Sequence, residues 1–407
     1  MMSSANTKES VPRIVFVTSF LDLGGSTTWL CDLAGELCKR QIPVRVFSLM
    51  ANHPLAAEFH ERGIDVLVQQ ERRLIYEERL QAILEAMRDF QPTTAVGWTG
   101  TPSYEALRYV PQGILKIGVL HSDYLPVYQG AKPYVPSMDR VVVLSSRMAE
   151  EALSCFQCAP GKILHLRLGV EVPNVPRQLD HGAGQPLRIL YLGRVQQEQK
   201  RAHLFPEILR DLCATGMPFV WTIAGDGPER TRLEKVLGTN NPTQTVRVVG
   251  SVTYSKIPAL LEAHDVFLLA SDYEGLPHTL LEAMGYGLVP VVSDLPSGIR
   301  EVVDETTGRL VNVNDIAGYA RSVHWLHTHR QEMTRMSRAA EQRVRDQFSI
   351  HAMTDQWLTM APAQSAGPAN WPRKFAIRRP LVHPWPWAFF EPFRTARRVV
   401  KRLSASA

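Results

Sequence analysis

The sequence has no run of about 20 uninterrupted apolar residues, the length that a membrane-spanning helix needs. We therefore expect no integral membrane protein. Cysteine is also scarce: the 407 residues include only five, an odd number, and the first ten residues contain no apolar stretch of signal-peptide length. These features favour a protein of the reducing cytoplasm over a disulfide-linked secreted one.

The sequence has few patterns that are typical of a metal-binding site. Cys155 and Cys158 have the spacing of a redox or zinc motif, but no second pair of this kind completes a zinc site, and we expect ordinary thiols. No Asp-x-Asp pair follows a predicted strand, as a metal-bridged donor site would require. We expect neither a metal nor another cofactor.

Positive charge is not spread evenly along the chain. The formal net charge is +5, yet residues 365–407 contain nine Lys or Arg and one acid, Glu391, so the remaining body carries about −3. The basic character therefore belongs to the tail, which argues against a nucleic-acid-binding fold. A composition of 45% hydrophobic and 21% charged residues is globular, and the length suits two domains.

The sequence is rich in an alternation of short apolar runs and helical patterns. In the first half the runs begin at residues 13, 44, 65, 94, 115 and 140, and in the second half at 187, 219, 246, 265 and 289. Such alternation predicts parallel strands with right-handed helical crossovers. Between the halves, residues 167–186 are polar and include prolines and glycines, as is typical of an interdomain linker.

We therefore predict an α/β fold with two Rossmann-like, doubly wound domains facing across a cleft, plus a basic aromatic C-terminal tail. The predicted domains are 1–178 and 179–347. Residues 348–361 are predicted to form a terminal helix that returns to the N-terminal domain, and 362–407 form the tail. Ligands of such folds bind at the carboxyl ends of the strands.

The most informative segment runs from Glu274 to Glu282. It follows a predicted strand, turns at Gly275 and places Pro277 where a first helical residue should be. The helix start then offers free backbone N–H groups to a diphosphate, near Leu276, His278 and Thr279. Glu282, about one and a half turns into the helix, suits two neighbouring ribose hydroxyls, and Glu274 can accept hydrogen bonds from sugar hydroxyls.

This segment resembles the retaining glycosyltransferases of family four, which have the GT-B fold. Their signature is two glutamates separated by seven residues, and Glu274 and Glu282 fit it together with the words Glu-Gly-Leu-Pro and Leu-Glu-Ala-Met. The resemblance covers roughly residues 12–360. It implies transfer of a sugar from a nucleoside diphosphate sugar to an unidentified hydroxyl acceptor, with retention, in glycan, polysaccharide or glycolipid synthesis. In that reading the first domain is the acceptor side and the second binds the donor.

The resemblance assigns roles to further residues of the second half. Arg194 and Lys200 fit the family's Gly-Arg and Lys pair, which neutralises the donor diphosphate, and we expect both to face the open cleft. Arg201, which replaces a glycine of the family pattern, competes for this phosphate role. Gly225 and Asp226 fit a tight turn beside the nucleotide.

Weaker assignments concern the nucleobase and the first half. The backbone near Val252 is implied to read a base edge, without revealing which base it is. Gly25 lies in a Gly-Gly turn between a predicted strand and a helix, where backbone can approach the donor phosphate. His121, at a predicted strand end, is implied to lie near the reacting sugar, with Asp123 as a weaker neighbour.

Three other functions are considered. A glycoside hydrolase fits poorly because its two carboxylates flank the scissile bond across an open cleft. A nucleotide-sugar epimerase of similar fold stays open, as does an inactive nucleotide-sugar-binding protein. The joint presence of two cations and two glutamates at the predicted site favours turnover.

The tail lies outside the resemblance. Residues 371–403 combine tryptophans and phenylalanines with basic residues, which predicts reversible attachment to an anionic membrane surface, on the inner face of the membrane. Four prolines between 380 and 392 prevent one long amphipathic helix. The alternative is that these aromatics pack on the first half of the protein.

Overall fold

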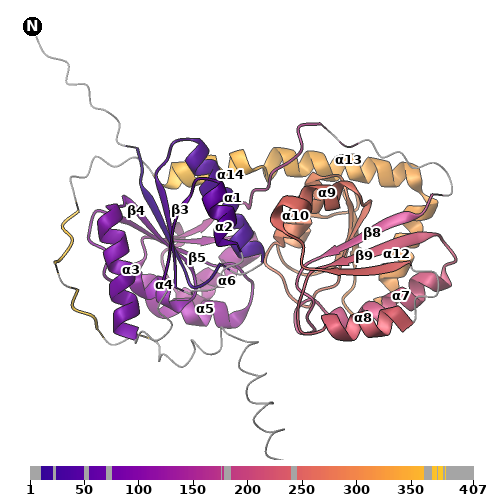
Figure 1. Ribbon diagram of the computed structural model, residues 1–407, viewed down its shortest axis with the longest axis horizontal. Helices are drawn as coiled ribbons and strands as arrows, with labels where there is room; N and C mark the ends of the chain where they lie inside the picture. Colours follow the sequence, from indigo (N-terminus) through magenta and orange to yellow (C-terminus); the bar gives the residue numbers. More distant parts are fainter. Residues whose placement is uncertain are drawn as a thin grey trace, which may run out of the picture.

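The computed structural model describes residues 11–21, 24–49, 55–69, 76–175, 177, 185–239, 245–361, 369–373, 375–378 and 381. Two parallel sheets, each flanked by helices, form two lobes (Figure 1). The predicted fold class is confirmed. The predicted boundary between residues 178 and 179 lies outside the described ranges.

The first sheet has the strand order β3-β2-β1-β4-β5-β6-β7. Its strands are β1 (Ile14–Thr18), β2 (Val44–Ser48), β3 (Asp65–Val68), β4 (Thr94–Thr99), β5 (Leu115–Val119), β6 (Arg140–Val143) and β7 (Ile163–His165). Its helices are α1 (Gly25–Lys39), α2 (Ala56–Glu61), α3 (Tyr76–Phe90), α4 (Thr101–Leu107), α5 (Leu125–Ala131) and α6 (Ser146–Phe156), with short 3-10 turns η1 (Lys132–Ser137) and η2 (Pro160–Lys162).

The second sheet has the order β10-β9-β8-β11-β12-β13. Its strands are β8 (Leu187–Leu192), β9 (Phe219–Ala224), β10 (Val246–Gly250), β11 (Val266–Leu269), β12 (Val289–Ser293) and β13 (Arg309–Val311). The helices that follow β8 in the chain are α7 (Phe205–Ala214), α8 (Arg230–Thr239), α9 (Ile257–Glu262), α10 (His278–Gly285), α11 (Ile299–Val302), α12 (Ile316–Thr328), α13 (Arg330–Gln347) and α14 (Ile350–Met360), with 3-10 turns η3 (Ala202–Leu204) and η4 (Tyr254–Lys256).

The strand order explains where a ligand site forms. In each sheet the order reverses beside the first strand, between β1 and β4 and between β8 and β11. At such a switch point the loops leave in opposite directions and open a crevice. The central strands are apolar and buried on both faces, as in β1, because helices cover both sides of the sheet.

Several local predictions need correction. The edge strands β7 and β13 are not predicted by the apolar pattern because each has only three residues. Helix α4 begins at Thr101, and Gly100, at φ 79°, precedes it. Pro277 is extended and precedes α10, which begins at His278. Ser145 caps α6: its hydroxyl accepts from the Met148 amide at 3.2 Å.

The chain returns to the first domain at its last helix. Figure 1 shows α13 lying along the second domain and α14 continuing over the first, beside α1. The Trp29 indole donates to Met353 Sδ at 2.7 Å. Trp357 is buried, with its ring 6.0 Å from that of Phe16 and 6.1 Å from that of Trp98. The N-terminal core is therefore completed by residues that follow the second domain.

Part of the tail packs against the first domain. Phe375 is buried, with the Arg88 guanidinium of α3 6.0 Å from its ring centroid. The Arg378 amide donates to the Tyr109 hydroxyl at 2.8 Å. For this segment the self-packing alternative holds. Of the aromatics predicted to contact a membrane, Trp371 lies beside Phe375, with the ring centroids 6.1 Å apart. The others lie outside the described residues: Trp385, Trp387, Phe389, Phe390 and Phe393.

No helix in the described ranges combines the length and the apolar character that crossing a bilayer requires.

Candidate active site

Two helix N-termini, one from each domain, meet between the sheets. Helix α1 begins at Gly25 after β1, and α10 begins at His278 after β11. A Cβ added to Gly25 would lie 3.2 Å from the His278 Cβ, so the approach is closer than most side chains accept. Because helix N-termini carry unpaired N–H groups and positive partial charge, their convergence favours an anionic ligand.

Arg194 brings a free cation to the same place. It follows β8, is exposed, and its Nη2 would lie 3.7 Å from a Cβ added to Gly24. Among the described residues, no side chain or backbone group forms a hydrogen bond or ion pair with its guanidinium, although its carbonyl accepts from the Tyr191 hydroxyl at 2.6 Å. The guanidinium is therefore available to a ligand.

Lys200 and Glu274 form an ion pair beside Arg194. The Lys200 Nζ lies 2.5 Å from Glu274 Oε1, and the two side chains are only 13% and 6% exposed. The Ser271 hydroxyl donates to the same oxygen at 2.7 Å, and the Gln199 amide donates to Oε2 at 3.3 Å. The expectation that Lys200 faces an open cleft is therefore wrong, because a buried carboxylate holds its ammonium.

Arg201 is turned away from these cations. Its backbone adopts φ 46°, its Nε lies 3.1 Å from an Asp272 carboxylate oxygen, and its Nη1 donates to the Val313 carbonyl. Its guanidinium therefore binds the loops that follow β11 and β13. The geometry therefore leaves Arg194 and Lys200 as the cations at the switch point.

Glu282 belongs to a buried charged cluster that sequence reasoning missed. The His278 imidazole lies between two carboxylates: its Nδ1 is 3.5 Å from Glu282 Oε2, and its Nε2 is 3.5 Å from Asp32 Oδ2 of α1. The Tyr254 hydroxyl donates to Asp32 Oδ1 at 2.6 Å. Two signals were present in the sequence: Asp32 interrupts an apolar helix, and His278 precedes Glu282 by four residues, one helical turn.

His121 lies at the end of β5 against this region. Its Nε2 lies 2.7 Å from the Trp98 carbonyl, which can only accept, so this nitrogen carries the proton. Burial lowers the pKa of His121 to about 4, so the ring is neutral at pH 7. A Cβ added to Gly275 would lie 3.2 Å from the His121 carbonyl oxygen, which places the two domains in direct contact here.

Two known family descriptions match this chain in succession. "Glycosyltransferase Family 4" matches residues 23–172, and "Glycosyl transferases group 1" matches residues 179–343. The chain belongs to the GT-B glycosyltransferases of the family-four type.

Curated relatives and solved structures agree with this family. The putative colanic acid biosynthesis glycosyltransferase WcaL of Salmonella typhimurium is 31% identical over 216 residues, covering 51% of this chain and 53% of that protein. The amylovoran biosynthesis glycosyltransferase AmsK of Erwinia amylovora is 30% identical, covering 54% and 55%. The chain thus matches about half the length of these relatives.

Among solved structures, TarM of S. aureus superposes with a TM-score of 0.72 at 13% identity, covering 86% of this chain and 99% of that chain. HepE of Anabaena gives 0.71 at 15% identity, with the same coverage. At sequence identities this low, the structural similarity shows that this chain shares the fold of those proteins.

The remaining predicted residues of this family-four protein line the same edge. Gly225 has φ 138°, and a Cβ there would lie 1.8 Å from the Gly193 carbonyl oxygen, so the turn requires glycine. Asp226 Oδ1 accepts from the Gly227 amide at 2.8 Å. Leu276 is buried, and Thr279 and Val252 are partly buried.

Asp123 does not join the central cluster. It accepts from the Tyr128 hydroxyl at 2.8 Å and pairs with Arg147 at 3.1 Å, both in its own domain. Beside it, the rings of Tyr124 and Tyr273 stack between the domains, with centroids 5.1 Å apart and planes 14° from parallel.

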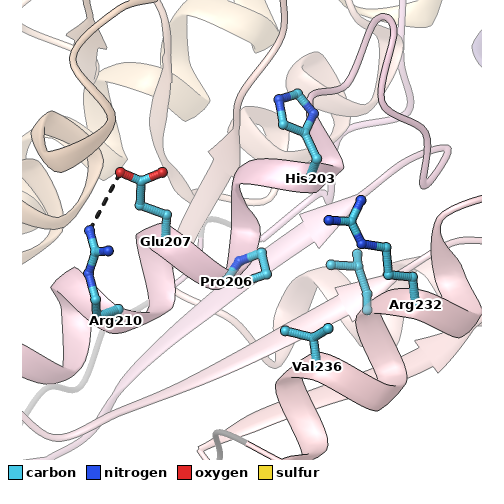
Figure 2. Close-up of a pocket in the computed structure, with 7 residues that line it drawn as sticks. His203, Pro206, Glu207, Arg210, Arg232 and Val236 are labelled. Carbon is cyan, nitrogen blue, oxygen red and sulfur yellow. Dashed lines mark hydrogen bonds and ion pairs between the residues drawn. The ribbon is translucent and has the colours of Figure 1, made fainter.

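A separate hollow of about 310 Å³ lies on the second domain between α7 and α8 (Figure 2). It contains none of the predicted site residues, and Figure 2 shows Glu207 and Arg210 paired with each other there, at 3.5 Å. Within the described ranges, no cluster of three or more metal-binding side chains is present.

Proposed function

We propose that this family-four GT-B protein transfers a sugar from a nucleoside diphosphate sugar to a hydroxyl of a growing glycan, with retention at the anomeric carbon and without a metal. The observation that carries the proposal is the exposed Arg194 guanidinium, which has no hydrogen bond or ion pair to any described residue. It lies beside two converging helix N-termini, next to the Lys200 and Glu274 pair. TarM was solved in complex with UDP, and HepE with UDP and glucose, which supports a nucleotide-sugar donor here.

In this proposal the diphosphate binds at the N-terminus of α10, where Arg194 and Lys200 neutralise its charge. That charge grows as the sugar leaves, so preorganised cations and N–H groups stabilise the transition state more than the bound donor. Glu274 accepts from hydroxyls of the sugar, and Glu282 accepts from the ribose. The acceptor oxygen bonds to the anomeric carbon on the face from which the diphosphate departs, and the bond between that carbon and the diphosphate oxygen breaks. The departing diphosphate takes up the proton of the acceptor hydroxyl.

The ion pair between Lys200 and Glu274 fits this role. A Lys200 ammonium held 2.5 Å from Glu274 is already oriented, so little side-chain entropy is lost when a diphosphate arrives. The neutral His121 is assigned to the sugar side of the site, where it can contact the donor sugar without adding charge.

The glycan assignment has its own support. By their names, WcaL is a putative glycosyltransferase of colanic acid biosynthesis and AmsK a glycosyltransferase of amylovoran biosynthesis, and each matches about half of this chain. We further propose that the basic aromatic tail attaches the protein to an anionic membrane surface, because each Lys or Arg near such a surface contributes about 1 kcal/mol.

The deciding experiment incubates the protein with labelled UDP-, GDP- and ADP-sugars, with and without a mixture of glycan and glycolipid acceptors. We expect release of one nucleoside diphosphate that rises with acceptor and falls sharply in Arg194→Ala. Conversion of the sugar to its epimer without acceptor would identify the epimerase instead. Tight donor binding with no turnover under any condition would identify the inactive binding protein.

A further inference from the structure

Two carboxylates from different domains face the same imidazole. His278 is 3% exposed, Asp32 comes from α1 of the first domain, and Glu282 lies one turn further along α10 in the second. Both ring nitrogens lie 3.5 Å from a carboxylate oxygen, which is ion-pair distance but too long for a good hydrogen bond. The imidazole is therefore held by charge between the domains.

Asp32 is itself tied to the opposite domain a second time. Its Oδ1 accepts from Arg62 Nη1 at 2.9 Å within the first domain and from the Tyr254 hydroxyl at 2.6 Å across the interface. The Arg62 guanidinium lies 4.6 Å from the centroid of the Tyr254 ring. Arg62 also pairs with Glu58 at 3.6 Å. These contacts fix the Asp32 carboxylate in one position.

The neighbouring carboxylates decide whether His278 is protonated. Burial alone would lower the pKa of His278, but the charges of Glu282 and Asp32 outweigh it and raise that pKa to about 10. The groups that face the ring are Asp32 from α1, Glu282 from α10 and, beyond Asp32, Arg62 and Tyr254. A protonated imidazole between two buried carboxylates compensates charges that would otherwise be costly to bury.

We propose that His278 is a positioning residue that couples closure of the two domains to the placement of Glu282. In the closed form Asp32 holds one side of the ring, and the other side holds the carboxylate that contacts the nucleotide ribose. When the domains separate, Asp32 leaves both His278 and Tyr254. His278 then stays beside Glu282 on α10 but loses the partner that fixes the orientation of its ring. This coupling rests on the proposed function only for the identity of the ligand.

Such coupling is reciprocal: if closure positions Glu282 for a nucleotide, a bound nucleotide favours closure by the same factor. Asp32 then influences affinity from the first domain, although the ribose carboxylate belongs to the second. A simple packing role for Asp32 would instead change stability without depending on Glu282.

The test is a double-mutant cycle between Asp32→Asn and Glu282→Gln in the full chain. Nucleotide affinity is measured by titration calorimetry with UDP, GDP and ADP. We expect Asp32→Asn to weaken binding of the preferred nucleotide about tenfold in the wild-type background, and hardly at all in the Glu282→Gln background. Equal losses in both backgrounds would overturn the coupling while leaving the proposed function intact.

A matched control is available in His351→Gln. His351 also pairs with a buried carboxylate of α1, Glu36, at 2.9 Å, but it lies on α14 and is 73% exposed. We expect this variant to bind nucleotide as the wild type does. A loss equal to that of Asp32→Asn would assign the effect to α1 stability instead.

Closure is also measured without any ligand. Small-angle X-ray scattering should show a larger radius of gyration for Asp32→Asn and Tyr254→Phe than for the wild type and His351→Gln. Tyr254→Phe removes one hydroxyl and keeps the ring, so it provides a conservative variant if others fold poorly. If no nucleotide binds the wild type, the proposed function fails, and identical scattering of all four proteins would overturn closure by this cluster.

Discussion

The Lys200 ammonium and the Glu274 carboxylate are each other's counter-ion, with 2.5 Å between Nζ and Oε1. The second cation of the site, Arg194, has no such partner among the described residues and is exposed. The two cations share one proposed role, but Lys200 is paired with a buried carboxylate, whereas Arg194 is exposed and has no partner among the described residues. Their substitutions should separate catalysis from stability.

Arg194→Ala should remove transition-state stabilisation and leave folding unchanged. Loss of one preorganised donor typically lowers kcat by about 10² to 10³. The melting temperature should match the wild type because, within the described part of the chain, the guanidinium makes no hydrogen bond or ion pair that could be lost. Arg210→Ala on α7, 68% exposed, is the control for a surface arginine. Wild-type turnover in Arg194→Ala would place the diphosphate elsewhere.

Lys200→Ala should lose both turnover and stability, whereas a cation that faced an open cleft, as expected from the sequence, would lose mainly turnover. Removal of the ammonium leaves Glu274 charged and buried, which costs about 3 kcal/mol of unfolding free energy. Adding Glu274→Gln should restore much of the stability but no activity. Urea unfolding of the single and double variants measures both, and an unchanged midpoint for Lys200→Ala would contradict the ion pair.

Acidification should destabilise the protein through His121. Its pKa in the fold is about 4, below the ordinary 6.5, so the unfolded chain takes up the proton first. The stabilising contribution is therefore complete above pH 6.5 and is lost as the pH falls toward 4. Between pH 7 and 5 this amounts to about 2 kcal/mol. His121→Gln should lose less unfolding free energy than the wild type over that pH range. Parallel curves of unfolding free energy against pH for the two proteins would refute this role of His121.

Alkaline conditions should act through His278 in the opposite sense. Its pKa in the fold is about 10, above the ordinary 6.5, so the fold binds the proton more tightly than the unfolded chain does. The stabilising contribution is complete below pH 6.5 and is lost as the pH rises through 10. Melting temperatures recorded from pH 6.5 to 10 should fall more steeply in the wild type than in His278→Gln. Equal slopes would show that the ring is neutral.

Two truncations divide the roles of the tail. A chain ending at Leu381 keeps Phe375 on α3 and should melt like the full chain, yet lose co-sedimentation with anionic vesicles. A chain ending at Ala361 should lose about 2 kcal/mol of stability as well, since the buried Phe375 ring is removed. High salt should weaken vesicle binding of the full chain. Equal sedimentation of all three chains would exclude the tail as the attachment.

The sequence predicts what is local. Buried strands and the Glu274 to Glu282 segment have patterns within a few neighbouring residues, so the two sheets and the helix start of the donor site are predictable. The meeting of Asp32 with His278 is not predictable, because 246 positions separate them and only the packing of the two domains against each other brings them together. For the same reason, the burial of Lys200 by Glu274 could not be inferred from a charged turn.

The return of α14 to the first domain has a consequence for synthesis on the ribosome. Trp357 belongs to the aromatic core around Phe16 and Trp98, yet it is translated after the whole second sheet. Domains generally fold as units during translation, from the N-terminus onward. Here the earlier domain lacks a central side chain until the later one has emerged, so the second domain should reach its native state first and the first domain should depend on chaperones for longer.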